Sequence, residues 1–234
     1  ANTADQLPVY LAGFSLGANV MLKALGELGP NALTRYNIQG ATAYCAPLNC
    51  EECYEFLHKP GINKEIYAKK LLKTMKKKAQ VQLELFCDND PTTSWFDFPG
   101  TQEASTIMEF ENAFICTMYG YDDFIDYYRK TGAIYYMQDI MVPTLVLNAK
   151  DDPFMNPNYW PTDIVRETKA PIKMIRTEHG GHCGHMFHKS TTTTTTTEVG
   201  GSDGEEQRPL WTQNAYAPKQ LARFIQHVMQ NTSS

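Results

Sequence analysis

The sequence predicts an α/β fold in which a mostly parallel sheet is flanked by helices. Residues 7–47 follow the order strand, helix, strand, which is the unit from which parallel sheets are built. Two further short runs, at 143–148 and 172–175, are typical of buried parallel strands. A chain of 234 residues is long enough to bury a sizeable core around such a sheet.

The first predicted strand ends in a serine motif. Residues 9–12 are apolar, and the motif Gly-Phe-Ser-Leu-Gly at 13–17 stands between them and the helix-forming run 18–27. A serine at such a turn is exposed, and the two glycines remove Cβ atoms that would block the turn. The helix directs its positive dipole end at the site, so Leu16 N–H is the expected oxyanion donor. The motif predicts Ser15 as a nucleophile for acyl transfer.

A long helical segment follows the second strand, which is expected at 38–44. From residue 48 to about 136 the pattern is helical and carries no strand signal. The stretch 66–78 mixes lysines with apolar residues and predicts a basic amphipathic helix, which contacts either anionic lipid headgroups or, more commonly, solvent. An aromatic helix is expected at 110–128, mostly packed in a core, with part of it lining an acyl pocket.

The third predicted strand ends at two adjacent acids. Asp151 and Asp152 follow residues 143–148 after a gap of two residues, Ala149 and Lys150. A carboxylate just past the carboxyl end of a parallel strand lies at the same edge of the sheet as the serine turn. Pro153 fixes the backbone immediately behind Asp152, which favours Asp152 as the acid, and Asp151 stays open as the alternative.

The fourth predicted strand leads into a loop rich in glycine and histidine. His182 follows two glycines, at 180 and 181, whose backbone freedom lets the loop approach Ser15. We therefore select it as the base from the histidines of this segment, which are His179, His182, His185 and His188. The chain order serine, aspartate, histidine is that of the α/β-hydrolase triad and differs from the chymotrypsin and subtilisin orders.

The same segment, with Cys183 in it, raises the alternative of a metal site. A catalytic zinc takes three protein ligands, and two histidines four residues apart on a helix are a typical pair. Here the histidines are three residues apart, and the intervening glycines favour a loop without a fixed ligand face. We therefore expect no metal and no other cofactor.

Composition and charge exclude several classes of function. A net charge of −5 argues against nucleic-acid binding, which needs a basic surface. No stretch approaches the roughly 18 consecutive apolar residues of a membrane span. The six cysteines are expected to be reduced thiols in an intracellular compartment, with Cys50 and Cys53 as ordinary helix residues. Membrane association through a segment upstream of residue 1 stays open.

Composition shifts abruptly after the histidine segment. Residues from about 189 to 209 are of low complexity and offer little to bury, which predicts a disordered insertion. Structure is expected to resume in a terminal helix at 215–230, which packs through Leu221, Phe224, Ile225 and Val228.

Four motifs together resemble those of the AB-hydrolase type 4 family of α/β-hydrolases. They are residues 12–19 around the serine, Cys45-Ala46-Pro47, residues 147–154 around the acids, and residues 180–184 around the histidine. Members of that family are esterases and lipases acting on acyl esters, including glycerolipids and phospholipids. The resemblance implies Ser15 as nucleophile, Asp152 as orienting acid and His182 as base.

The resemblance also implies a division of the chain. Residues 1–47 correspond to the core unit with the serine turn, 48–136 to a helical cap in the usual lid position, and 137–234 to the core with the acid and histidine loops. The family has a large amino-terminal half, whereas this sequence begins one short loop before the serine strand. We therefore expect this sequence to be the carboxyl-terminal portion of a longer enzyme, with amino-terminal strands missing and an open edge on the first strand. It would also lack the loop that supplies the second oxyanion N–H, so we expect it to be inactive by itself.

The function expected from these residues is that of a serine hydrolase. It would cleave carboxylic esters, with acyl esters of lipids as substrates, through a Ser-His-Asp triad and an acyl-enzyme intermediate. An acyltransferase with the same triad and a hydrolase-fold binding protein without catalysis are the alternatives. Peripheral contact of the cap with a membrane stays open, and the sequence does not indicate an oligomeric state.

Overall fold

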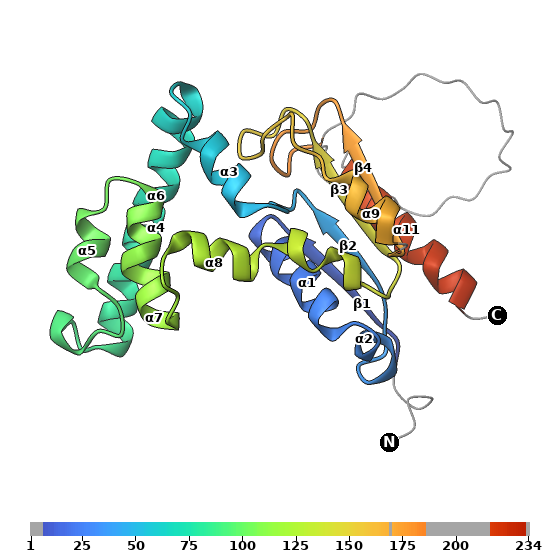
Figure 1. The fold of residues 1–234 in the computed structure, drawn as a ribbon, viewed down its shortest axis with the longest axis horizontal. Coiled ribbons are helices and arrows are strands. Elements are labelled where there is room, and N and C mark those ends of the chain that lie inside the picture. Colours follow the sequence, from blue (N-terminus) through green and yellow to red (C-terminus); the bar gives the residue numbers. More distant parts are fainter. Residues whose placement is uncertain (1–6, 169, 186–215, 233–234) are drawn as a thin grey trace, which may run out of the picture.

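The computed structural model describes residues 7–168, 170–185 and 216–232 of the chain (Figure 1). Within them one four-stranded sheet has the order β1-β2-β3-β4, and all neighbouring strands are parallel. The strands are β1 (Val9–Phe14), β2 (Ile38–Tyr44), β3 (Thr144–Ala149) and β4 (Ile172–Thr177). The expected α/β fold is confirmed, and every strand end lies within two residues of its expected position.

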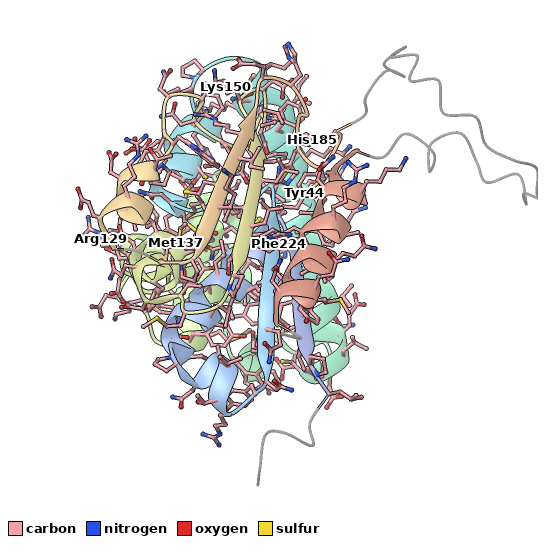
Figure 2. The ribbon with its side chains drawn as sticks, turned by 90° about the vertical axis from the view of Figure 1, so that its right-hand side faces the viewer. Tyr44, Arg129, Met137, Lys150, His185 and Phe224 are labelled. Carbon is pink, nitrogen blue, oxygen red and sulfur yellow. The ribbon has the colours of Figure 1, made fainter. Side chains whose placement is uncertain are left out.

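Helices cover both faces of the sheet. α1 (Leu16–Leu28) packs against β1 and β2, and α11 (Tyr216–Thr232) packs against β2 and β3. Figure 2 shows α11 on one side of the strands, with Phe224 labelled on it. Side chains alternate between the two faces along β3, because Val146 packs with the buried residues of α1 and Leu145 with those of α11.

A helical segment connects β2 to β3. It consists of α3 (Cys50–Leu57), the π-helix η2 (Asn63–Ala68), α4 (Lys69–Phe86), η3 (Pro91–Thr93), α5 (Phe98–Glu103), α6 (Ile107–Glu111), η4 (Asn112–Cys116), α7 (Thr117–Tyr119), α8 (Phe124–Thr131), η5 (Ala133–Tyr135) and η6 (Met137–Asp139). Figure 1 shows α4 to α7 gathered to one side of the sheet. They have a core of their own, in which Leu72, Phe96 and Phe110 are buried. Cys50 and Cys53 lie in a helix, α3, as expected.

The aromatic stretch at 110–128 is not the single helix that its composition predicts. Gly120, with φ of 73°, ends α7, and the Asp123 carboxylate accepts a hydrogen bond from Asp126 N–H at the start of α8. A glycine in the left-handed conformation terminates helices, and an aspartate N-cap starts them. The aromatic residues of this stretch therefore come from separate helices.

The remaining expectations concern the edges of the sheet and the end of the chain. α11 is the expected terminal helix, and two short helices, α2 (Asn31–Thr34) and α9 (Thr162–Thr168), precede β2 and β4. The insertion expected at about 189–209 lies outside the described residues. Among the described strands β1 pairs with β2 alone, so one edge of β1 is open there. In the same residues, no helix is both long and apolar enough to cross a membrane.

Candidate active site

Ser15 lies at a sharp turn between β1 and α1. Its backbone has φ 50° and ψ −127°, a region that costs energy for a residue with a side chain. Three backbone hydrogen bonds hold it there. Ser15 N–H donates to the Tyr44 carbonyl at the end of β2 (2.9 Å), and the Ser15 carbonyl accepts from Ala18 N–H (3.0 Å) and Asn19 N–H (3.2 Å). The turn has the strand-to-helix form of a nucleophile elbow.

The two glycines of the motif, Gly13 and Gly17, differ in how closely other atoms approach them. A Cβ at Gly13 would lie 2.6 Å from Ala18 Cα, so only glycine lets the end of β1 approach α1 this closely. Apart from its chain neighbours and the backbone of its own helix, a Cβ at Gly17 would meet no described atom within 4 Å. The expectation that glycine is needed here is therefore confirmed for Gly13, and for Gly17 it stays a prediction.

The three predicted triad residues meet at the carboxyl end of the sheet. The His182 Nε2 atom lies 2.8 Å from Ser15 Oγ, and its Nδ1 atom lies 2.8 Å from Asp152 Oδ2. The Asp152 side chain is fully buried, whereas that of His182 is 22% exposed. Asp152 can therefore hold the imidazole at Nδ1, while the Nε2 edge of the ring, which faces Ser15, stays open to a substrate. This is the geometry that a nucleophile, its base and an orienting acid require.

The two adjacent aspartates have different partners. Asp152 also accepts a hydrogen bond from Phe154 N–H (2.9 Å), which fixes its carboxylate toward His182. Asp151 instead accepts from Gly181 N–H (2.7 Å) and lies 3.4 Å from His179 Nδ1. Burial acts to raise the pKa of Asp151, but these hydrogen bonds outweigh it and lower that pKa. Asp151 therefore anchors the backbone of the histidine loop, and the geometry favours Asp152 as the orienting acid.

His185 is a structural histidine that the sequence does not single out. Its Nδ1 atom lies 2.8 Å from Tyr44 Oη and its Nε2 atom 2.8 Å from Thr177 Oγ1, so it bridges β2 and β4. Figure 2 labels His185 and Tyr44, whose rings lie next to each other. Burial raises the pKa of Tyr44 to about 12, which keeps its hydroxyl protonated. A Cβ at Gly180 would lie 2.3 Å from the His185 ring, so this glycine is needed where the loop crosses the ring. His185 thereby supports the loop that carries His182.

The buried His185 predicts a pH dependence of stability. Burial lowers its pKa below the ordinary value of 6.5. In the unfolded chain His185 takes up a proton near pH 6.5 and in the folded chain only at lower pH, so the contribution of His185 to stability falls as the pH drops below about 6.5. Burial raises the pKa of Glu111 to about 7, and this acts in the opposite direction between pH 7 and pH 5, so the test compares variants. In urea unfolding, the free energy at pH 5 minus that at pH 7 should be more positive in His185→Gln than in the wild type.

The exposed His227 of α11 provides the control for this experiment. His227→Gln should keep the wild-type dependence on pH. Burial lowers the pKa of His58 as well, so a histidine contribution to the pH dependence of the unfolding free energy should remain in His185→Gln. If the unfolding free energy of His185→Gln depends on pH as that of the wild type does, His185 is not held in the neutral form.

The histidines of the segment do not share one ligand position. The His179 side chain is 91% exposed and lies beside Asp151, whereas His185 is buried between Tyr44 and Thr177. His188 lies outside the described residues. Among the described histidines of this segment, His182 alone reaches Ser15.

Leu16 is placed as expected for an oxyanion donor. It is the first residue of α1, and the first N–H groups of a helix have no partner within the helix. Together with the helix dipole, these groups favour negative charge beside Ser15. The role of Leu16 in catalysis stays a prediction.

The fold and this site place the chain in a family. The family model described as alpha/beta hydrolase fold matches residues 2–189. The chain therefore belongs to the α/β-hydrolase fold family.

Three relatives are similar to this chain over about three quarters of its length. YheT of Escherichia coli (strain K12), named as a candidate esterase, is 33% identical over 180 residues, which are 76% of this chain and 49% of YheT. The phospholipase ABHD3 of Homo sapiens is 25% identical over 76% of this chain and 41% of its own length. The monoacylglycerol lipase ABHD2 of Danio rerio is 26% identical over 78% of this chain and 43% of its own length. The chain thus spans about half the length of these relatives or less.

Proposed function

We propose that this protein is a serine hydrolase that cleaves carboxylic esters through an acyl-enzyme intermediate. The observation that carries the proposal is the continuous relay from Ser15 Oγ through the His182 ring to the buried Asp152 carboxylate, with both contacts at 2.8 Å. The names of the relatives, which include a candidate esterase, a phospholipase and a monoacylglycerol lipase, support the same class of reaction.

The proposed reaction has two steps. Ser15 Oγ attacks the ester carbonyl carbon while His182 Nε2 takes the hydroxyl proton, and Leu16 N–H stabilises the oxyanion. Asp152 holds the Nδ1–H tautomer of the imidazole and stabilises the imidazolium. His182 then gives the proton to the leaving alcohol, which leaves an acyl ester on Ser15. Water, deprotonated by His182, attacks that ester, and His182 returns the proton to Ser15 as the carboxylic acid leaves.

A cleft beside His182 is the proposed acyl site. It has a volume of about 610 Å³ and lies between the histidine loop and the helices η2 and α4. The Phe154 ring is 4.5 Å from the His182 ring and 5.6 Å from the Tyr67 ring, so apolar surface continues from the base into the cleft. The apolar side chains of the lining are Ile66, Tyr67, Leu71, Pro153 and Phe154. A cleft of this size and lining suits an apolar acyl chain, and we propose that residues 48–136 act as the cap over it.

Filling this cleft should change the preference for acyl length. Leu71→Trp puts a larger side chain into the cleft, so we expect kcat/KM for an octanoyl ester to fall about 10-fold relative to an acetyl ester. Leu85→Trp is the matched control, since Leu85 lies on the same helix, is 69% exposed and does not line the cleft. An equal fall for both esters in Leu71→Trp would show that the acyl chain lies elsewhere.

We also propose that η2 and α4 contact an anionic lipid surface. Ile62 and Ile66 are exposed, at 64% and 53%, and the exposed Lys73 and Lys77 lie on the adjoining helix. Since Ile66 also lines the cleft, a bilayer contacted there would lie next to the acyl site. Apolar side chains beside lysines suit anionic headgroups, at about 1 kcal/mol for each lysine near the surface.

Sedimentation with vesicles tests the lipid contact. The double substitution Lys73→Gln with Lys77→Gln should weaken binding to phosphatidylserine vesicles by about 2 kcal/mol, or roughly 30-fold. Lys23→Gln with Lys130→Gln removes the same charge from other helices and should leave binding close to wild type. Equal losses in the two double variants would indicate a general charge effect and contradict a docking face on α4.

The acyltransferase alternative differs only in the acceptor of the acyl group. The same triad would pass the acyl group from Ser15 to an alcohol in place of water. Product analysis with an added alcohol separates the two, since a hydrolase releases mainly free acid. A binding protein without catalysis would release neither product.

A further inference from the structure

Two cysteines lie beside the proposed general base. The Sγ atoms of Cys45 and Cys183 and a ring nitrogen of His182 all lie within 4.8 Å of one another. We propose that these three side chains bind a thiophilic divalent cation of the Zn²⁺ and Cd²⁺ type, and that the bound cation inhibits the enzyme by occupying His182. The binding site stands on the cluster alone, whereas inhibition rests on the proposed function.

The fold holds the two thiols side by side. Cys45 directly follows β2 with φ 52°, and Cys183 directly follows His182 with φ 62°. Cys183 N–H donates a hydrogen bond to Cys45 Sγ (3.2 Å), and the Cys45 thiol donates to the Gly181 carbonyl (3.8 Å). The loop after β2 and the histidine loop are thus joined through the sulfur of Cys45.

The donor set fits a borderline-soft cation. Zn²⁺ prefers thiolate and imidazole ligands in a tetrahedral arrangement, with Zn–S near 2.3 Å and Zn–N near 2.0–2.1 Å, which places ligand atoms about 3.5–3.8 Å apart. The cluster must therefore contract by about 1.3 Å at most. Cys183 can supply this movement because it is exposed and is followed by Gly184.

Charge and protons balance on binding. Each of the two thiols releases its proton to solvent, and two metal–sulfur bonds form in their place. The two thiolate charges neutralise the divalent cation, so the partly buried site gains no net charge. One open coordination position is left for water.

The triad already orients His182 as a metal ligand. A histidine that binds a metal through one ring nitrogen usually donates its other N–H to a carboxylate. Asp152 Oδ2 holds that position at His182 Nδ1, at 2.8 Å, so a cation that keeps this contact would bind through Nε2. Nε2 is also the atom that faces Ser15 Oγ. A cation bound there uses the lone pair that would accept the serine proton, so binding and catalysis exclude each other.

Titration of the reduced chain with Cd²⁺ tests the site. The ultraviolet charge-transfer band of cadmium–thiolate bonds reports binding without substrate. All variants carry Cys50→Ser and Cys53→Ser, since that pair could also bind the ion. We expect one Cd²⁺ to bind per chain and ester hydrolysis to be lost as the band grows. A chelator should remove the band and restore hydrolysis. Cys183→Ser and Cys45→Ala should each remove the band. Each should also raise the Cd²⁺ concentration that gives half-inhibition by roughly 10-fold or more. The control Cys116→Ser should change neither the band nor this concentration.

A measurement on the unsubstituted chain covers the case in which a variant does not fold. Cd²⁺ should protect Cys183 from alkylation by iodoacetamide, as mapped by mass spectrometry. A band that persists in Cys183→Ser, or equal alkylation of Cys183 with and without Cd²⁺, would overturn the site. Full hydrolysis with the band saturated would overturn the inhibition. Absence of ester hydrolysis in the full-length protein without Cd²⁺ would contradict the proposed function, and the band would still support the binding site.

Discussion

Ser15→Ala is expected to lower kcat for ester hydrolysis on the order of 10⁴-fold or more. The substitution removes the oxygen that would form the acyl ester, while His182 and Asp152 keep their mutual contact. Without the nucleophile, catalysis is limited to what the oxyanion donor and binding supply. Initial rates on a chromogenic ester, measured at saturating substrate, provide the test.

The control for this substitution is a serine outside the site. Ser105→Ala alters an exposed serine before α6 and should leave kcat within a few-fold of wild type. Urea unfolding of both variants separates a loss of chemistry from a loss of fold. A Ser15→Ala protein that is folded and keeps wild-type kcat would assign the nucleophile to another residue.

Asp152→Asn is expected to lower kcat on the order of 10⁴-fold, because the amide favours the wrong tautomer of the imidazole. Asp152 accepts from the His182 ring at 2.8 Å, and an asparagine at this position can present an NH₂ group to Nδ1 in place of an acceptor. The proton then resides on Nε2, where the lone pair for the serine proton is needed. Steady-state kinetics at a fixed pH measure the loss.

Asp151→Asn is the matched comparison for Asp152. It changes the neighbouring carboxylate, which accepts from Gly181 N–H and not from the ring of His182. An asparagine oxygen can still accept that bond, so we expect a loss in kcat below about 10-fold. A larger loss in Asp151→Asn than in Asp152→Asn would reverse the assignment of the acid.

The strands and the serine turn could be predicted because their signals are local. Adjacent residues around Ser15 indicate the order of strand, turn and helix. The short apolar runs that form β3 and β4 are characteristic of a parallel sheet. Parallel strands end at a common edge, so the meeting of Ser15, Asp152 and His182 also followed from topology.

Other features depend on contacts between residues far apart in the sequence. The roles of His185 and Cys45 arise where the histidine loop crosses the end of β2, and no local pattern indicates which residues meet there. The open space at Gly17 likewise depends on packing around the first turn of α1. By contrast, the break in the aromatic stretch had local signals in Gly120 and Asp123, which its hydrophobic pattern obscured.

Covalent labelling with a fluorophosphonate probe tests whether Ser15 is an activated nucleophile. The probe reacts with a serine only where a base takes its proton, so labelling requires Ser15 Oγ and His182 Nε2 to work together. We expect one adduct per chain, mapped to Ser15 by mass spectrometry, absent in Ser15→Ala and strongly slowed in His182→Ala. Labelling that continues unchanged in Ser15→Ala, or that maps to a different residue, would contradict the proposed mechanism.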